Sequence, residues 1–210
     1  MIIRWHGHAC FEISNGRTIV TDPHDGKSIG IKPPQVKADL VLVSHGHFDH
    51  NSVKTVSKGS TKIISTVGKF EEFGIKVKGV KAFHDNVGGE RRGEISIYNF
   101  SIDGVNFCHL GDLGHIPTQD IVKSLGNIDI LFIPIGNVFT IGAQDAWKTI
   151  KLLNPKIAIP MHYRVGGLSL SIQPLEPFLK NVDKVERVGN EIDFVPEDLP
   201  NDFEVWVFSL

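Results

Sequence analysis

The chain has 210 residues, 41% of them hydrophobic and 22% charged, and its formal net charge is −2 at pH 7. This length fits one domain over residues 1–210 with a core that needs no disulfides or structural metal. The acidic balance argues against an extended nucleic-acid-binding surface, and no segment approaches the ~20 apolar residues of a membrane span. The first residues also lack the apolar region of a signal peptide. We therefore expect a cytoplasmic protein whose partner is a small molecule, with no nucleic acid or membrane, and leave a homo-oligomer open.

Short apolar and β-branched runs separated by turns dominate the first half of the chain. Asn15-Gly16 and Asp103-Gly104 each stand between two such runs, which is typical of β-hairpins. The continuous apolar run 40–43 predicts a strand buried on both faces. In chain order, the strands predicted for this half are 10–13, 17–21, 40–43, 62–65, 75–80, 94–100 and 105–108.

In the second half, strand-like runs alternate with segments of helical spacing. Thr118 is a suitable N-cap for a helix that ends before Gly126, and residues 143–153 predict a helix that ends before Asn154-Pro155. Strands separated by helices, with no linker between them, predict an α/β domain. The remaining predictions are a helix over 175–182 and strands over 130–133, 157–159, 185–188, 192–195 and 203–208.

The two cysteines, Cys10 and Cys108, lie far apart in sequence and form no CxxC motif. Scattered cysteines of this kind are typical of small buried side chains in a reducing compartment. We expect no disulfide.

The strongest chemical signal is the hexapeptide His45-Gly46-His47-Phe48-Asp49-His50, in a chain with ten histidines. It follows the predicted strand 40–43, and Gly46 permits a sharp turn that aims His45 and His47 at one point. Three imidazoles and a carboxylate suit Zn²⁺ or a similar divalent ion. Four such groups on one turn cannot all bind one ion with good geometry, so we expect further ligands elsewhere.

Three other ligand-type residues stand in the same position relative to an apolar run. His84 directly follows the apolar run 77–83, Asp112 follows the predicted strand 105–108, and His162 follows the run 157–161. Residues after strands of an α/β sheet commonly meet at one edge. We therefore expect them to complete a metal site with the hexapeptide.

These motifs, in this order, resemble those of the metallo-β-lactamase superfamily. The resemblance is carried by HGHFDH, His84, Gly111-Asp112 and Pro160-Met161-His162-Tyr163, with Thr21-Asp22-Pro23 similar to the first motif. It extends from Trp5-His6-Gly7-His8 to His162 and is closest to the small single-domain branch related to L-ascorbate-6-phosphate lactonase. It implies a four-layer αββα sandwich, in which two mixed β-sheets are flanked by helices and the metals lie at one end between the sheets.

The resemblance also implies two divalent metal ions, Zn in the first instance with Mn or Fe as alternatives. The implied ligands are His45, His47 and His84 for one ion, Asp49, His50 and His162 for the other, and Asp112 as the bridge. Asp22 would orient a ligand or the metal-bound water. The family usually has Ser or Thr after the third-motif histidine, whereas Asp85-Asn86 follow His84 here. The role of Asp85 stays open between a partner of the site and a solvated loop residue.

Two such ions would hold a bridging hydroxide as the nucleophile, so a metal-dependent hydrolase is expected. Asp49 and Asp112 are the predicted catalytic carboxylates, with Asp112 receiving or relaying the proton of the water. His115 could donate a proton to the leaving group. Residues proposed to line the cleft or contact substrate are His8, Tyr163 and Arg164, and Arg91 and Arg92 either bind a phosphate or carboxylate or belong to a solvated hairpin.

The expected substrate is small, with an anionic phosphorylated lactone or a related ester as the first candidate. A phosphodiesterase or nuclease of the same fold is an alternative, although the acidic balance and the lack of a basic insert weigh against it. A non-hydrolytic di-iron oxidoreductase or a simple metal-binding protein is another. Against the oxidoreductase, 210 residues leave no room for a flavin partner domain.

Overall fold

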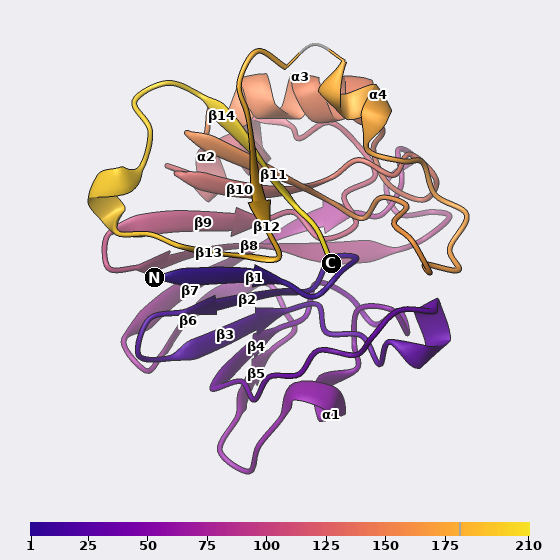
Figure 1. The fold of residues 1–210 in the computed structure, drawn as a ribbon. Coiled ribbons are helices and arrows are strands. Elements are labelled where there is room, and N and C mark those ends of the chain that lie inside the picture. The colour runs from indigo at the N-terminus through magenta and orange to yellow at the C-terminus, as the bar shows by residue number, and fades with distance from the viewer. Residues whose placement is uncertain (181) are drawn as a thin grey trace.

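The structure is a computed structural model that describes residues 1–180 and 182–210. Two facing β-sheets form its centre (Figure 1). The smaller sheet is antiparallel from β13 to β3, and β4 and β5 continue it in parallel. Its six strands, in spatial order, are β13 (Glu191–Asp193), β1 (Ile2–Trp5), β2 (Phe11–Ser14), β3 (Thr18–Thr21), β4 (Leu40–Leu42) and β5 (Lys62–Ile64).

The larger sheet is also mixed. Four strands at one side pair antiparallel, and four further strands join in parallel from the pair β9·β10 onward. Its eight strands, in spatial order, are β12 (Val185–Gly189), β14 (Glu204–Phe208), β11 (Ile157–Met161), β10 (Ile130–Pro134), β9 (Val105–His109), β8 (Glu94–Ile102), β7 (Ile75–Phe83) and β6 (Gly68–Glu72).

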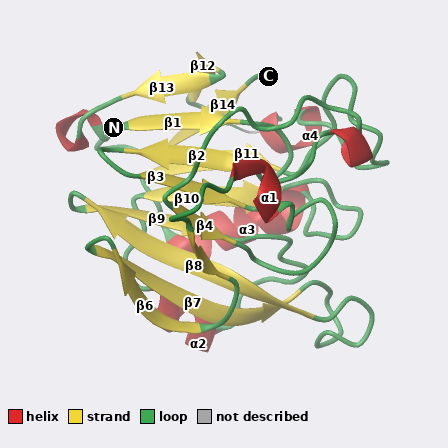
Figure 2. Cartoon of the chain, turned by 90° about the horizontal axis from the view of Figure 1, so that it is seen from below, coloured by secondary structure: helices red, strands yellow, loops and turns green. Residues whose placement is uncertain are grey.

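Helices cover the outer faces of both sheets, which gives the predicted αββα order of layers. The larger sheet carries α2 (Gln119–Leu125), α3 (Ala143–Leu153) and α4 (Glu176–Leu179), and the smaller sheet carries α1 (Val53–Val56) (Figures 1 and 2). The outer layers are thin, since α1 and α4 have four residues each. Two short 3-10 turns, Lys27–Ile29 and Pro196–Asp198, complete the regular structure.

The run 40–43 is continuously apolar because the strand it forms is buried on both faces. Leu40 and Leu42 belong to the main core, whereas Val41 between them belongs to a second cluster with Val20 and Val56 on the outer face. Because side chains alternate along a strand, a strand covered on both faces needs apolar residues at every position. The hexapeptide therefore starts from a strand that is fixed on both sides.

Aromatic side chains join the two sheets in the core. Phe11 on β2 meets Phe132 on β10, with ring centroids 4.4 Å apart, and both rings are fully buried. Removing a Phe side chain from water stabilises a fold by about 1.5–3 kcal/mol. Contacts of this kind hold the sheets in fixed relative position, and with them the loops at the strand ends.

The helix boundaries follow the local signals in the sequence. The Thr118 hydroxyl accepts a hydrogen bond from Ile121 N and so caps α2, as predicted. Helix α3 ends at Asn154, whose φ of 48° is left-handed, directly before Pro155. Its buried positions are Ala146, Thr149, Ile150 and Leu153, the spacing of a single helix face.

The structure differs from the sequence predictions at several strands. It contains β1 and β6, which were not predicted, and β7 extends to Phe83. The strand predicted over 192–195 is β13, shifted toward Glu191. The helix predicted over 175–182 is observed only as the shorter α4 (Glu176–Leu179), and residue 181 of that prediction lies outside the described residues.

Both hairpins are confirmed, since β2 pairs with β3 and β8 with β9 in antiparallel register. Asp103 and Gly104 have φ of 47° and 84°, the conformation for which this pair of residues is favoured. Cys10 and Cys108 are buried free thiols, as expected. In the residues that the structure describes, no helix has the length and apolar character to cross a membrane.

Candidate metal centre

The predicted ligands meet at one end of the sandwich, where several strands finish. The hexapeptide follows β4, His84 directly follows β7, and His162 directly follows β11. Asp22 and Asp112 come after β3 and β9 in the same way. Of the clustered ligand-type residues, His45 is half-buried, His47 is exposed, and the others are buried. The sheets therefore bring together residues that are far apart in sequence.

Asp112 lies at the middle of this cluster. Its Oδ2 is 3.2 Å from His50 Nε2 and 3.3 Å from both His84 Nε2 and His162 Nε2. His45 Nε2 is 3.8 Å from the same oxygen. The other oxygen, Oδ1, is buried and has no hydrogen-bond partner among the described residues. A buried carboxylate is costly without compensation, so this arrangement fits a site for cations.

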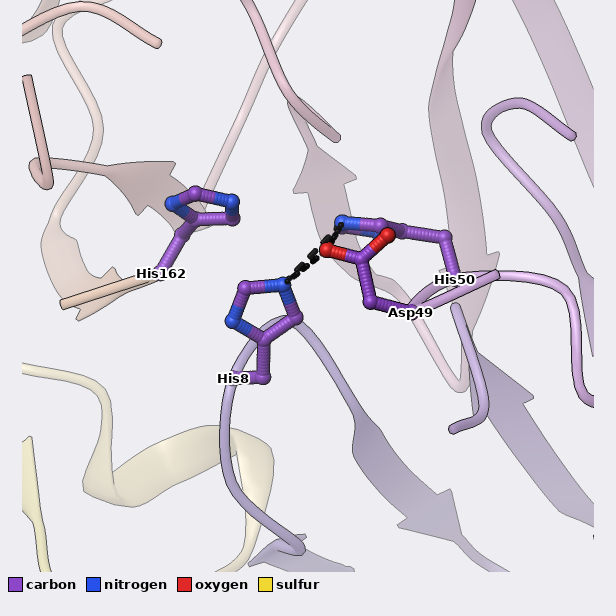
Figure 3. A group of neighbouring side chains, drawn as sticks. All are labelled: His8, Asp49, His50 and His162. Carbon is purple, nitrogen blue, oxygen red and sulfur yellow. Dashed lines mark hydrogen bonds and ion pairs between the residues drawn. The ribbon is translucent and has the colours of Figure 1, made fainter. Parts of the chain in front are cut away.

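The remaining donor atoms form two main groups around Asp112, and a third, overlapping group joins Asp22 to His45 and His50. In each group, one possible ligand atom per residue lies within 4.8 Å of the others. The first group is His45, His47 and His84, and the second is His8, Asp49, His50 and His162 (Figure 3). Nitrogen and oxygen donors of this kind fit the divalent metals expected from the sequence.

Asp22, which belongs to neither of the two main groups, orients one ligand of each. Its carboxylate accepts hydrogen bonds from the backbone N–H and the hydroxyl of Ser44, each at 2.6 Å. His50 Nδ1 lies 3.0 Å from the Asp22 carboxylate, so Asp22 holds a proton on Nδ1 and the ring directs Nε2 toward Asp112. Because the Ser44 hydroxyl donates to Asp22, it accepts from His45 Nδ1 at 2.8 Å. Both imidazoles therefore present Nε2 to the centre.

Protonation states in the cluster follow from burial and from the neighbouring carboxylates. Burial acts to lower the pKa of His50, but Asp112, Asp22 and Asp49 outweigh it and raise this pKa, so the ring gives up a proton when it binds a metal. Burial lowers the pKa of His45 and of His8 to about 3, so both rings are neutral near pH 7. Burial alone would raise the pKa of Asp112, but the neighbouring His162 and His50 rings outweigh burial and hold this pKa well below its usual range. Neutral imidazole and ionised carboxylate are the forms that bind metals.

Two residues of the site were not singled out from the sequence. Ser44 precedes the hexapeptide and connects Asp22 to His45. His109, at the end of β9, lies 2.9 Å from the Ala9 carbonyl through Nε2, and its Nδ1 accepts the Gly111 N–H. Gly111 itself leaves no room for a side chain, because a Cβ there would lie 2.6 Å from Ser44 Cβ. Neither role has a local sequence signal, since both depend on a partner on another strand.

The predicted proton donor His115 and two predicted substrate residues lie in other surroundings. Both ring nitrogens of His115 contact backbone groups, with Nε2 accepting from Phe83 N and Nδ1 lying 2.9 Å from Ile116 O. This leaves no free N–H on His115 to protonate a leaving group, so we do not carry that role forward. Tyr163 is buried against Trp5 and donates to Phe208 O, inside the core. Arg164 is exposed and does not line the cavity beside the cluster.

Asp85 organises the loop that follows His84. Its carboxylate accepts backbone hydrogen bonds at 2.8–3.0 Å, and the donors are Val87 N, Gly89 N, Arg91 N and Arg92 N. Burial acts to raise its pKa, but these bonds outweigh it and lower the pKa to about 2. The open question about Asp85 thus has a structural answer: it fixes the backbone that carries the two arginines.

A cavity of about 260 Å³ opens beside the cluster. Its lining includes Asp49, Asp112 and His162 of the cluster together with Arg92 and Phe139. The Arg92 guanidinium lies over the Phe139 ring, 3.7 Å from its centroid. A second cavity of about 490 Å³ shares Arg92 and Phe139 with the first. A hollow of about 1060 Å³, whose lining includes Arg4 and Leu210, contains none of the clustered ligands.

Comparison with known proteins places the chain in a family. Residues 2–162 match the model of the beta-lactamase superfamily domain, so the chain belongs to that superfamily. A UPF0173 metal-dependent hydrolase of Thermoplasma acidophilum is 33% identical over 79% of this chain and 84% of the relative. Another, from Thermococcus onnurineus, is 31% identical over 89% of this chain and 94% of the relative. Within the superfamily, the chain is therefore a member of the UPF0173 metal-dependent hydrolases.

A solved structure agrees with this assignment. The protein is a candidate Zn-dependent hydrolase of the metallo-beta-lactamase superfamily from Thermotoga maritima. It is 38% identical, with a TM-score of 0.83, and the match covers 99% of this chain and 97% of that one. The two-sheet fold and the superfamily expected from the motifs are confirmed.

Proposed function

We propose that this protein is a binuclear metal hydrolase that acts on a small substrate with an anionic group, such as a phosphorylated lactone or ester. The observation that carries the proposal is the position of Asp112, whose Oδ2 lies within 3.3 Å of three imidazole nitrogens drawn from both donor groups. A single carboxylate shared in this way suits a bridge between two cations.

The residues present fit such a pair of ions. We assign His45, His47 and His84 to the first ion, Asp49, His50 and His162 to the second, and Asp112 to both. Zn²⁺ is the first choice for this donor set, and Mn²⁺ or Fe would also accept it. When bound, divalent ions lower the pKa of a coordinated water and polarise a carbonyl or phosphoryl oxygen.

The protein's own residues supply position and charge around the reacting groups. Asp22 and Ser44 fix the orientation of His45 and His50, which removes rotational freedom from two ligands before substrate arrives. Asp49 and Asp112 present carboxylate oxygens at the wall of the cavity, where either can accept a hydrogen bond from an attacking water. These are the proton-accepting groups of the proposed reaction.

Arg92 supports the anionic substrate. Its guanidinium faces both cavities over the Phe139 ring, and in the described part of the chain no carboxylate forms an ion pair with it. Its backbone is fixed by Asp85, so the side chain starts from a defined position. An arginine that is free to bind and close to the reacting groups suits a phosphate or carboxylate on the substrate. The cavity of about 260 Å³ limits the part of the substrate that reaches the cluster to a small group.

The test is metal analysis combined with a substrate panel. Purified protein is assayed for bound metal and for hydrolysis of a phosphorylated lactone, a neutral ester and a phosphodiester. We expect about two ions per chain, and we expect His47→Ala to lose metal and activity together while His6→Gln, outside both donor groups, retains both. Full metal content with unchanged hydrolysis in His47→Ala would contradict the proposal. Preference for the phosphodiester would favour a nuclease instead.

A further inference from the structure

His8 occupies an unusual position in the turn between β1 and β2. Its φ is 54°, in the left-handed region, and it follows Gly7 with φ of 93°. The His8 carbonyl accepts hydrogen bonds from Trp5 Nε1 and from His162 N, each at 3.1 Å. The turn is thereby fastened both to its own strand and to the loop that carries the last predicted ligand.

The ring of His8 lies among the ligand atoms of the second group (Figure 3). Its Nε2 is 3.1 Å from Asp49 Oδ2 and 3.2 Å from His50 Nε2, and its ring centroid is 4.2 Å from that of His162. Two donor atoms that bind one ion at about 2.0–2.2 Å are themselves about 3–3.5 Å apart. The spacing of His8 is that of a ligand of the same ion.

The polar contacts of the His8 ring are made by Nε2, which faces Asp49 and His50. Its side chain is fully buried, and its Nδ1 has no partner among the described residues, a property it shares with His84 and His162. Because His50 keeps its proton on Nδ1, the Nε2 atoms of His8 and His50 face each other as potential donors to a cation. The remaining polar neighbour, Asp49 Oδ2, is also a proposed ligand.

Backbone strain supports a specific role for this residue. Asp22, His162 and His8 are the buried, charge-bearing or ligand-type residues of the site with left-handed φ, at 38°, 53° and 54°. This conformation is uncommon for residues other than glycine, although Asn, Asp and His adopt it more often than most, and the surrounding structure must offset its cost. Asp22 and His162 already have assigned roles at the centre. His8 has the same left-handed backbone, and its ring faces Asp49 and His50.

We infer that His8 Nε2 is a further ligand of the second metal ion, beside Asp49, His50 and His162. The inference rests on the proposed function, because it requires that ion to bind. It gives the second site three imidazoles in addition to carboxylate oxygen, and it makes the turn after β1 part of the metal centre. The first ion keeps the ligands His45, His47 and His84.

Metal titration of matched variants tests this assignment. Wild type, His8→Ala, His8→Gln and His24→Gln are stripped with a chelator and titrated with Zn²⁺ and with Co²⁺, whose visible absorption reports the ligands. Glutamine at position 8 can still donate a hydrogen bond to Asp49 but is a poor metal ligand. His24→Gln removes another buried imidazole whose Nδ1 also lacks a described partner, outside both donor groups.

We expect both His8 variants to bind the second ion at least about tenfold more weakly, with altered Co²⁺ absorption, whereas His24→Gln matches wild type. If His8→Gln retains wild-type affinity and absorption, His8 only positions Asp49 and the inference is wrong. If wild type binds a single ion, both the inference and the proposed binuclear function are wrong. If wild type binds two ions and His8→Gln behaves like wild type, only the inference is wrong.

A measurement on the unmodified chain covers the case in which the His8 variants do not fold. Cadmium-substituted wild type with isotope-labelled histidine nitrogens should show one-bond metal–nitrogen coupling at His8 Nε2. Coupling at His50 and His162 without coupling at His8 would overturn the assignment.

Discussion

Asp22 accepts two hydrogen bonds from Ser44, one from the backbone N–H and one from the hydroxyl, each 2.6 Å long. The same serine oxygen lies 2.8 Å from His45 Nδ1, and the same aspartate lies 3.0 Å from His50 Nδ1. One buried pair thus orients one imidazole of each donor group. This relationship makes Ser44 a point at which the centre can be tested without touching a proposed ligand.

Ser44→Ala should weaken metal binding while the fold persists. The substitution leaves His45 Nδ1 without its acceptor and removes one of the donors to Asp22, so His45 loses its fixed orientation. Loss of a partner that orients a metal ligand typically costs about 10–100-fold in metal affinity. The measurement is competition for Zn²⁺ against a chromophoric chelator. Ser28→Ala is the matched control, since the Ser28 hydroxyl donates to the exposed carboxylate of Asp25, outside the donor groups. Equal affinities for wild type and Ser44→Ala would contradict the orienting role.

Arg92→Ala should raise KM for substrates with a phosphate or carboxylate by about 10–100-fold, because a charge-assisted hydrogen bond contributes about 1.5–3 kcal/mol. The KM of a neutral ester and kcat should change much less, since Arg92 is assigned to the anionic group and not to the reacting atoms. Steady-state kinetics on an anionic and a neutral substrate of the same bond type measure this. Arg91→Ala removes the neighbouring exposed charge and serves as the control. Equal losses on both substrates would argue for a general structural effect.

His24 should make stability depend on pH in a defined window. Burial lowers its pKa from 6.5 to about 4, so between these values the unfolded chain binds a proton that the folded chain does not. Stability that is present above pH 6.5 is therefore lost progressively as the pH falls toward 4. At about 1.4 kcal/mol per pKa unit, His24 should account for about 3 kcal/mol of that loss.

Urea unfolding of wild type and His24→Gln, both in the presence of chelator, measures this contribution. The difference in unfolding free energy between wild type and His24→Gln at pH 7.5 is the reference. As the pH is lowered, wild type should lose more of its unfolding free energy than His24→Gln. A difference that stays constant from pH 7.5 to 4.5 would rule out this source of pH dependence.

Phe11→Ala should destabilise the fold by about 3–5 kcal/mol, the usual cost of removing a large buried ring. Phe11 meets Phe132 across the two sheets, so the cavity would open where the sheets are joined. Phe73→Ala is the control, because Phe73 is 39% exposed and lies under the Arg17 guanidinium. Chemical denaturation should show a small change for the control. A loss below about 1 kcal/mol for Phe11→Ala would mean that this contact does not hold the sheets together.

The sequence predicted the parts of the fold that local pattern determines. β4 was recognised because burial on both faces leaves a continuous apolar run, and α2 because Thr118 and Gly126 mark its ends. β6 (Gly68–Glu72) was missed because no residue in it is buried, and it is a strand through its backbone pairing with β7. β1 was missed because four residues at the chain start carry too short an alternation to predict a strand.

In the candidate site, too, the residues marked by a local sequence pattern could be predicted and those defined by distant contacts could not. The hexapeptide and the strand-end residues His84, Asp112 and His162 could be predicted, because ligand type and position after a strand are both visible in the sequence. The environment of Tyr163 could not be predicted, since its packing against Trp5 and its hydrogen bond to Phe208 O depend on segments far apart in the sequence. The arrangement around Ser44 and His8 depends on contacts with distant segments, and no local pattern carries that information.

The four imidazoles around Asp112 come from His45, His50, His84 and His162, on loops spread over most of the chain. A nascent chain that ends before β11 holds only part of this donor set, however well its first hairpins have formed. High-affinity metal loading is therefore a late event in folding that requires both sheets to be assembled. Tightly bound metal, counted against total protein, becomes a direct measure of how many molecules have reached the native state.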